Sequence, residues 1–108
     1  MHTALLLNHD CMGHGDPALG RKILAVFLRK LPSMQQVESI LMVNSGVKLV
    51  APDSPVLTEL RELEAHGVDL MPCGTCVEAY GIQVAAGEVS NMDEIVAELG
   101  RADKVITL

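Results

Sequence analysis

Short apolar runs alternate with amphipathic helical patterns along most of the chain. The first run, residues 4–7, is entirely apolar, as is typical of a strand buried in a parallel sheet. Asp16 and Pro17 then supply a good N-cap and first helical residue, and Pro32 ends that helix. Because strands and helices that alternate at this spacing form right-handed βαβ units, the pattern predicts an α/β fold with a parallel sheet between two helix layers.

The rest of the chain continues this alternation. Further strands are expected at short apolar runs: residues 40–43, 68–71, 83–86 (the weakest pattern) and 104–108. Further helices are expected from Ser54-Pro55 to about His66, directly after Cys73, and from Met92 to Gly100. The sequence therefore predicts five strands in a single domain over residues 1–108.

Composition excludes several classes of partner. Phe27 and Tyr80 are the only aromatic residues, so the chain lacks the stacking platforms typical of single-stranded nucleic-acid binding. The net charge is −6, and no Lys/Arg cluster is larger than a pair, which disfavours binding to a phosphate backbone. No apolar run approaches the roughly 18 residues of a membrane span. We therefore expect neither nucleic acid nor a membrane as a partner.

Cysteine usage predicts a compartment. The chain has three cysteines, an odd number, and its start lacks the basic segment of a secretory signal peptide. Unpaired thiols are typical of a reducing environment. We therefore expect a cytoplasmic protein whose thiols are functional.

The segment Cys73-Gly74-Thr75-Cys76 lies where a strand ends and a helix begins. Free N–H groups and the helix dipole stabilise an anion there, so the sequence predicts a lowered cysteine pKa. Cys73 is expected near the N-cap, where a thiol is often most exposed. The loops at 8–15 and 44–48 should meet this segment at the carboxyl edge of the sheet. They carry the candidate binding residues Cys11, Asn44 and Lys48, of which the lysine could bind an acidic group.

A CxxC pair permits dithiol redox chemistry, persulfide carriage or half of a metal site. A thioredoxin fold fits poorly, because the pair comes late and no proline follows it. A zinc or iron–sulfur site needs about four ligands. Cys11, His9 or His14 could join the pair, but no second CxxC or paired histidine motif is present. The stretch 13–18 matches a dinucleotide-binding pattern, yet its aspartate and proline oppose phosphate binding.

Several motifs occur together in a characteristic order: Asp10-x-Met12-Gly13-x-Gly15-Asp16, Asn44-Ser45-Gly46-Val47-Lys48-Leu49, Cys73-Gly74-Thr75-Cys76, Gly87-Glu88-Val89-Ser90-Asn91-Met92 and Ala102-Asp103-Lys104-Val105-Ile106. In this order they resemble the DsrE-like domain of YedF-type proteins, within the DsrE/DsrF/TusD superfamily of sulfur-relay proteins. The resemblance covers essentially the whole chain.

The resemblance implies a five-stranded parallel sheet in three α/β/α layers, assembled as homo- or hetero-oligomers. Members are sulfurtransferase-like: they carry sulfur as a cysteine persulfide, pass it between proteins and are sometimes linked to selenium metabolism. Their Cys-Val-x-Ala pattern corresponds to Cys76-Val77-Glu78-Ala79, which makes Cys76 the carrier. Cys73 is then expected to be a resolving thiol, and no cofactor is expected.

The chain departs from this family pattern in two ways. YedF-type chains usually have a TusA-like domain ahead of this one, so a separate TusA-like protein is the expected sulfur donor or acceptor. Cys11 stands where a small or hydroxyl residue is expected, and it is an additional acceptor, a metal ligand or incidental. Two other functions stay open: a non-catalytic oligomeric adaptor of a sulfur or selenium pathway, and a metal-binding protein that uses Cys11, Cys73 and Cys76.

Overall fold

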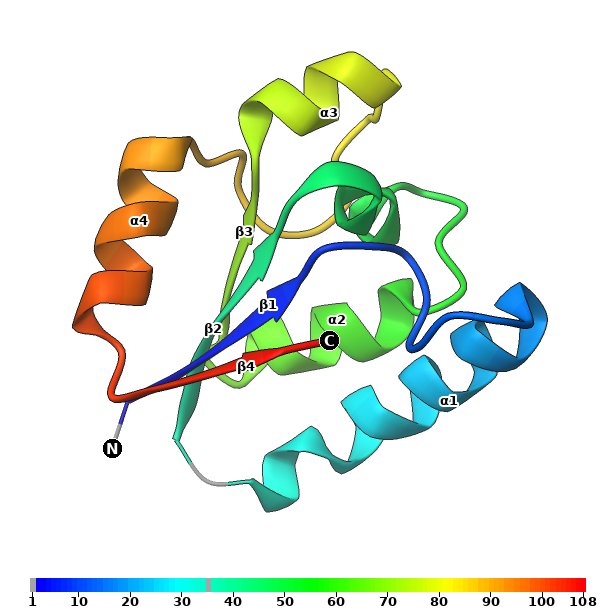
Figure 1. The fold of residues 1–108 in the computed structure, drawn as a ribbon, viewed down its shortest axis with the longest axis horizontal. Helices are drawn as coiled ribbons and strands as arrows, with labels where there is room; N and C mark the ends of the chain where they lie inside the picture. The colour runs from blue at the N-terminus through cyan, green and yellow to red at the C-terminus, as the bar shows by residue number, and fades with distance from the viewer. Residues whose placement is uncertain (1, 35) are drawn as a thin grey trace.

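Four parallel strands form the sheet at the centre of the described residues (Figure 1). The structure is a computed structural model that describes residues 2–34 and 36–108. Its strands are β1 (Thr3–Leu7), β2 (Val37–Met42), β3 (Asp69–Pro72) and β4 (Lys104–Thr107). They lie in the order β3-β2-β1-β4 and all pair in parallel. Their carboxyl ends therefore meet at one edge of the sheet.

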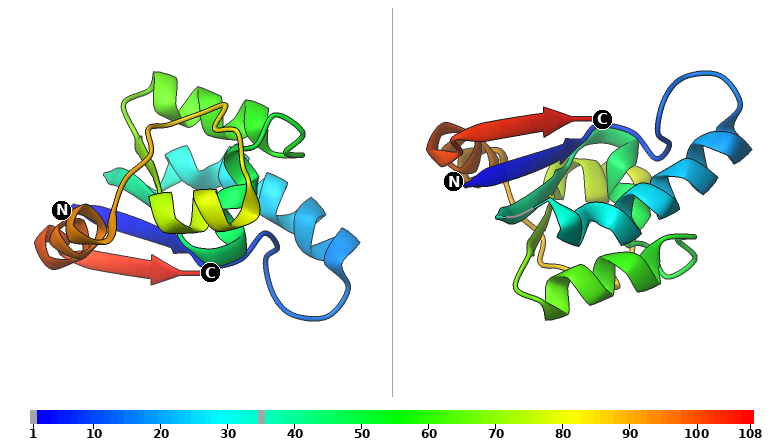
Figure 2. Two further views of the ribbon diagram at one scale, coloured as in Figure 1. Left: turned by 90° about the horizontal axis from the view of Figure 1, so that it is seen from above. Right: turned by 90° about the horizontal axis from the view of Figure 1, so that it is seen from below.

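Helices lie on both faces of the sheet and beyond its carboxyl edge (Figures 1 and 2). They are α1 (Pro17–Lys30), α2 (Leu57–Ala65), α3 (Gly74–Tyr80) and α4 (Met92–Arg101), with 3₁₀ helices η1 (Leu31–Ser33) and η2 (Asn44–Val50). Helices α1 and α2 cover one face and α4 covers the other, whereas α3 lies past the strand ends, against η2. None of the helices in the described part of the chain has the length and apolar character that crossing a bilayer requires.

Alternate strand residues pack against opposite helix layers. On one face, Leu5 and Ile40 belong to the apolar cluster that includes Leu24 of α1 and Leu60 of α2. On the other face, their neighbours along the strands, such as Leu41, pack with α4. This alternation follows from the two-residue period of a strand. The predicted α/β fold with a parallel sheet is confirmed, and its core is aliphatic.

The prediction of a fifth strand at residues 83–86 is wrong. The segment that follows it lies along the free edge of β3, where Glu88 and Ser90 donate N–H bonds to the carbonyls of Leu70 and Pro72, at 3.3 and 2.8 Å. This pairing amounts to one isolated bridge, at Ser90. A longer ladder would need an N–H from residue 72 directed at the same edge, and proline has none. The described sheet therefore has four strands.

The local signals at helix ends were mostly correct. The Asp16 side chain accepts a hydrogen bond from the Ala18 N–H at 3.0 Å, and Pro17 is the first residue of α1, as predicted. Helix α2 begins later than expected, because Ser54 caps a turn by accepting from the Val56 N–H at 3.2 Å. The predicted loop at residues 44–48 is instead part of η2.

Candidate functional site

Cys73 is the N-cap residue of α3, as predicted, but it is not exposed. Its backbone is extended, with φ −65° and ψ 123°, and its side chain makes no capping hydrogen bond. Only 3% of the residue is accessible, because it packs in the apolar cluster with Leu41 and Ile95. The expectation of an exposed N-cap thiol is therefore wrong, since α4 covers this side of the sheet.

Cys76 lies one turn further along α3 and is only partly buried. The backbone N–H of Asn44 donates a hydrogen bond to its Sγ at 3.1 Å. Asn44 adopts a left-handed conformation, with φ 51°, in the first residue of η2. Two residues later, a Cβ at Gly46 would lie 2.3 Å from the carbonyl oxygen of Leu7, so glycine lets η2 approach the end of β1. Close packing of η2 on β1 thus positions the N–H that faces the sulfur.

Tyr80 extends this contact into a network. It follows Cys76 by four residues on α3, a spacing that places both side chains on one helix face. Its hydroxyl donates to Asn44 Oδ1 at 2.6 Å, and the Nζ of Lys48 lies 4.7 Å from its ring centroid. The structure therefore brings the predicted residues Asn44, Lys48 and Cys76 together around Tyr80. Sequence reasoning missed Tyr80 as a site residue, although it is the chain's one tyrosine and lies one helical turn from a candidate thiol.

The pKa of the Cys76 thiol is raised rather than lowered. Burial raises this pKa most, the Asn44 N–H lowers it, and the neighbouring Cys73 thiol raises it further. The N–H that contacts the sulfur belongs to Asn44 at the start of η2 and not to α3, which has only seven residues. The predicted lowering of a cysteine pKa at this junction is therefore wrong, since lost hydration outweighs the N–H contact.

Cys11 lies in a different environment. Its thiol is 3.7 Å from Asp10 Oδ1 and 3.6 Å from the carbonyl oxygen of Pro17. Burial raises the pKa of Cys11, and the Asp10 carboxylate adds to the rise while Arg21 opposes it. In residues 2–34 and 36–108, no hydrogen bond or ion pair joins Cys11 to Cys76. The structure therefore shows no direct interaction of these kinds between Cys11 and Cys76.

A metal site is not assembled in the described residues. No three His, Cys, Asp or Glu side chains within 2–34 and 36–108 are placed so that they could hold a metal ion. The rings of His9 and His14 stack on each other, with centroids 5.2 Å apart. These residues therefore provide no set of ligands that would support the metal-binding alternative.

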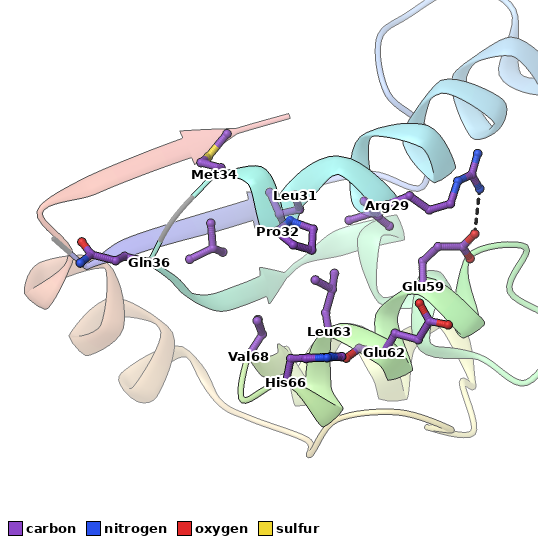
Figure 3. A pocket seen from close by; sticks show the side chains of 12 residues that line it. Arg29, Leu31, Pro32, Met34, Gln36, Glu59, Glu62, Leu63, His66 and Val68 are labelled. Atoms are coloured by element: carbon purple, nitrogen blue, oxygen red, sulfur yellow. Dashed lines mark hydrogen bonds and ion pairs between the residues drawn. The ribbon is translucent and has the colours of Figure 1, made fainter.

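Two cavities differ in their relation to these thiols. One, of about 290 Å³, lies between the carboxyl ends of α1 and α2 (Figure 3). Leu63 and Val68 contribute to its apolar wall, and the Arg29–Glu59 ion pair, 3.0 Å long, bridges the two helices beside it. Val68 directly precedes β3, so this cavity belongs to the amino edge of the sheet. The other cavity, of about 330 Å³, includes Lys48 in its lining and therefore adjoins the Cys76 network.

Comparison with known proteins identifies the family. The chain matches the model of the DsrE/DsrF-like family over residues 4–108. No curated protein matches its sequence.

Solved structures show the same fold. The ychN protein from E. coli is 19% identical over 100% of this chain and 100% of that one, with a TM-score of 0.72. MTH1491, a protein of unknown function from Methanobacterium thermoautotrophicum, is 18% identical over 99% of this chain and 98% of that one, with a TM-score of 0.72. BT1422 from Bacteroides thetaiotaomicron is 21% identical over 98% of this chain and 94% of that one, with a TM-score of 0.68. Since the family model spans nearly the whole chain and these structures share its fold, the chain belongs to the DsrE/DsrF-like family.

Proposed function

We propose that this protein is a sulfur-relay protein that carries sulfur as a persulfide on Cys76. Membership of the DsrE/DsrF-like family, whose members are generally related to sulfur relay, supports the reaction class. The observation that carries the choice of residue is the hydrogen bond from the Asn44 N–H to Cys76 Sγ at 3.1 Å. A fixed N–H at that place stabilises negative charge on sulfur, and Cys76 is more accessible than the buried Cys73.

Loading proceeds by thiol exchange without net oxidation. The Cys76 thiolate attacks the terminal sulfur of a donor persulfide, R–S–SH. A bond forms between Sγ and that sulfur while the donor's S–S bond breaks. The donor leaves as a thiolate and takes up the proton that Cys76 lost. Unloading is the same exchange with an acceptor thiol attacking the outer sulfur of the Cys76 persulfide.

We propose Cys73 as the resolving thiol. It lies three residues before Cys76, and its thiol is close enough to affect the Cys76 pKa through a hydrogen bond. Attack of the Cys73 thiolate on Cys76 Sγ would form a Cys73–Cys76 disulfide and release the outer sulfur as hydrosulfide. The two electrons taken up by the departing sulfur are those given up by the two thiols.

The remaining parts of the proposal concern assembly and partners. We propose a homo-oligomer of the YedF type in the cytoplasm, with a TusA-like protein as donor or acceptor. An exposed apolar stripe on α1, formed by Leu19, Ile23 and Val26, supports assembly, because such stripes commonly mark protein interfaces. Cys11 is a secondary acceptor in this scheme, separate from the Cys76 network.

Mass spectrometry after incubation with a small persulfide donor tests the proposal. The tryptic peptide from Glu62 to Arg101 contains both Cys73 and Cys76, so variants must separate them. We expect one added sulfur atom on this peptide in Cys73→Ser and none in Cys76→Ser. The wild type should show the added sulfur and the Cys73–Cys76 disulfide that resolution forms from it. Cys11→Ser is the matched control and should load normally. Absence of added sulfur in Cys73→Ser, where no resolving thiol can remove it, or equal loading of Cys76→Ser, would refute the carrier role.

A further inference from the structure

The cavity that Lys48 lines carries charges of both signs. It has a volume of about 330 Å³, near the lower end of the range for small-molecule sites, roughly 300 to 1,000 Å³. Asp10 and Arg21 contribute to it from the first loop and α1. Lys48 and Asp53 contribute from η2 and the loop after it. The first loop and α1 together therefore supply one cation and one carboxylate, and η2 with the loop after it supplies another such pair.

These four charges do not neutralise one another. Within residues 2–34 and 36–108, no ion pair joins any of the four to another charged side chain. Arg21, Lys48 and Asp53 are exposed, so solvent weakens their attraction to one another and leaves the charges available to a ligand. Apolar residues, among them Ile82, also line the cavity. A ligand that fits such a cavity carries both an anionic and a cationic group on a small body.

Lys48 belongs to this cavity and to the Cys76 network at once. Its Nζ lies 4.7 Å from the ring centroid of Tyr80, whose hydroxyl is bonded to Asn44. The backbone N–H of Asn44 in turn donates a hydrogen bond to Cys76 Sγ. A carboxylate in the cavity would compete with the Tyr80 ring for the Lys48 ammonium, because an ion pair is stronger than a solvent-exposed cation–π contact. Occupancy of the cavity is thus coupled to the residues that hold the sulfur.

We infer that this cavity binds a zwitterionic α-amino-acid thiol, with Arg21 and Lys48 facing its carboxylate and Asp10 and Asp53 facing its ammonium group. The inference rests on the proposed function, since the bound thiol is then the acceptor of the Cys76 sulfur. The acceptor thiolate attacks the outer sulfur of the Cys76 persulfide. The Sγ–S bond breaks as the new S–S bond forms, and Cys76 leaves as a thiolate that recovers the acceptor's proton.

Tyrosine fluorescence offers a direct measurement of binding. The chain contains one tyrosine and no tryptophan, so its emission reports on Tyr80 alone. The probe is L-cysteine under reducing, oxygen-free conditions. N-acetyl-L-cysteine, which lacks the ammonium group, and cysteamine, which lacks the carboxylate, are the comparators. Calorimetry with the same compounds measures binding independently of Tyr80.

We expect L-cysteine to change the emission with saturation and to bind at least about tenfold more tightly than either comparator. Arg21→Gln and Asp53→Asn should each weaken binding about tenfold. Lys22→Gln is the matched control, because Lys22 is exposed on α1 beside Arg21 but does not line the cavity. Equal binding of the three compounds, or equal effects of Arg21→Gln and Lys22→Gln, would overturn the inference.

A second measurement separates this inference from the proposed function. Protein loaded with labelled sulfur on Cys76 is mixed with L-cysteine, and release of the label is followed in the wild type and in Arg21→Gln. Faster release from the wild type supports the acceptor site. Equal release from both overturns it while the carrier role of Cys76 stands. If Cys76 takes up no label at all, the proposed function fails, and the acceptor role fails with it even where L-cysteine binds.

Discussion

The backbone N–H of Asn44 lies 3.1 Å from the Sγ of Cys76 and donates a hydrogen bond to it, although the two residues are 32 positions apart. Asn44 is at the start of η2 and Cys76 is in the first turn of α3. The contact opposes the effect of burial on the thiol, which otherwise raises the pKa of Cys76. The reactivity of this cysteine therefore depends on how a separate segment is held beside it.

The raised pKa of Cys76 predicts a shifted pH dependence of its alkylation. Burial disfavours the thiolate, so half-maximal reaction with iodoacetamide should occur at a higher pH than for a short peptide with the same CGTC sequence. Asn44→Val should shift the midpoint further upward, because a β-branched residue resists the left-handed φ of 51° and displaces the N–H. Asn44→Gly keeps that conformation readily and should shift it less. A wild-type midpoint below that of the peptide would contradict this prediction.

Tyr80 is predicted to support Cys76 through Asn44. Tyr80→Phe removes the 2.6 Å hydrogen bond to Asn44 Oδ1 but keeps the ring that Lys48 contacts. Since Tyr80 is 41% exposed, we expect the free energy of unfolding to fall by only about 0.5–1 kcal/mol. Persulfide loading of Cys76 should slow several-fold. Tyr80→Leu also removes the ring and should slow loading more, as measured by quenched mass spectrometry. Identical loading rates in all three proteins would exclude a supporting role.

Glu98 is predicted to make stability fall in acid. This buried residue contacts His2 Nε2 at 2.8 Å and pairs with Arg101. Burial acts to raise the pKa of Glu98, but hydrogen bonds from neighbouring side chains, including these two, outweigh it and leave the pKa lowered. A carboxyl with a lowered folded-state pKa stabilises the fold above its unfolded value, about 4.3, and this stabilisation disappears as pH falls through the folded-state pKa.

Glu98→Gln should therefore lower the free energy of unfolding by about 1–2 kcal/mol at neutral pH. The difference from the wild type should shrink steadily below about pH 4.3, as followed by urea unfolding at a series of pH values. Glu62→Gln is the control, since Glu62 is exposed and forms no ion pair within the described residues. A difference that grows toward acid pH would show that the sign of the shift is wrong.

Gly46 is predicted to be intolerant of a side chain. A Cβ there would lie 2.3 Å from the carbonyl oxygen of Leu7, which is backbone and cannot rotate away. We expect Gly46→Ala to reduce the free energy of unfolding by about 1–3 kcal/mol and to weaken the alignment of η2 with Cys76. Gly100→Ala is the matched control, because no atom lies within 4 Å of its added Cβ, and alanine favours the helix by about 0.5–1 kcal/mol. Thermal unfolding that ranks the two variants in the opposite order would contradict the packing argument.

Local sequence signals predicted most of the secondary structure. The Asp16–Pro17 pair places the start of α1, and the apolar run at 4–7 lies within β1. Both features depend on neighbouring residues: a side chain that caps its own helix, and a continuous apolar segment that is buried on two faces. The sequence predicts a fifth strand that the described sheet lacks, because strand formation at that edge depends on whether the partner residue, here Pro72, can donate an N–H.

The sequence by itself determined the order of the elements and placed Cys73 and Cys76 at a strand-to-helix junction, since spacing along the chain is enough for both. Tertiary packing decided what each thiol does there. It buried Cys73 under α4, left Cys76 partly accessible, and brought Asn44 to both Cys76 and Tyr80 across more than thirty positions of sequence. It also reversed the predicted pKa shift, because desolvation and through-space hydrogen bonds depend on distances that no local pattern contains.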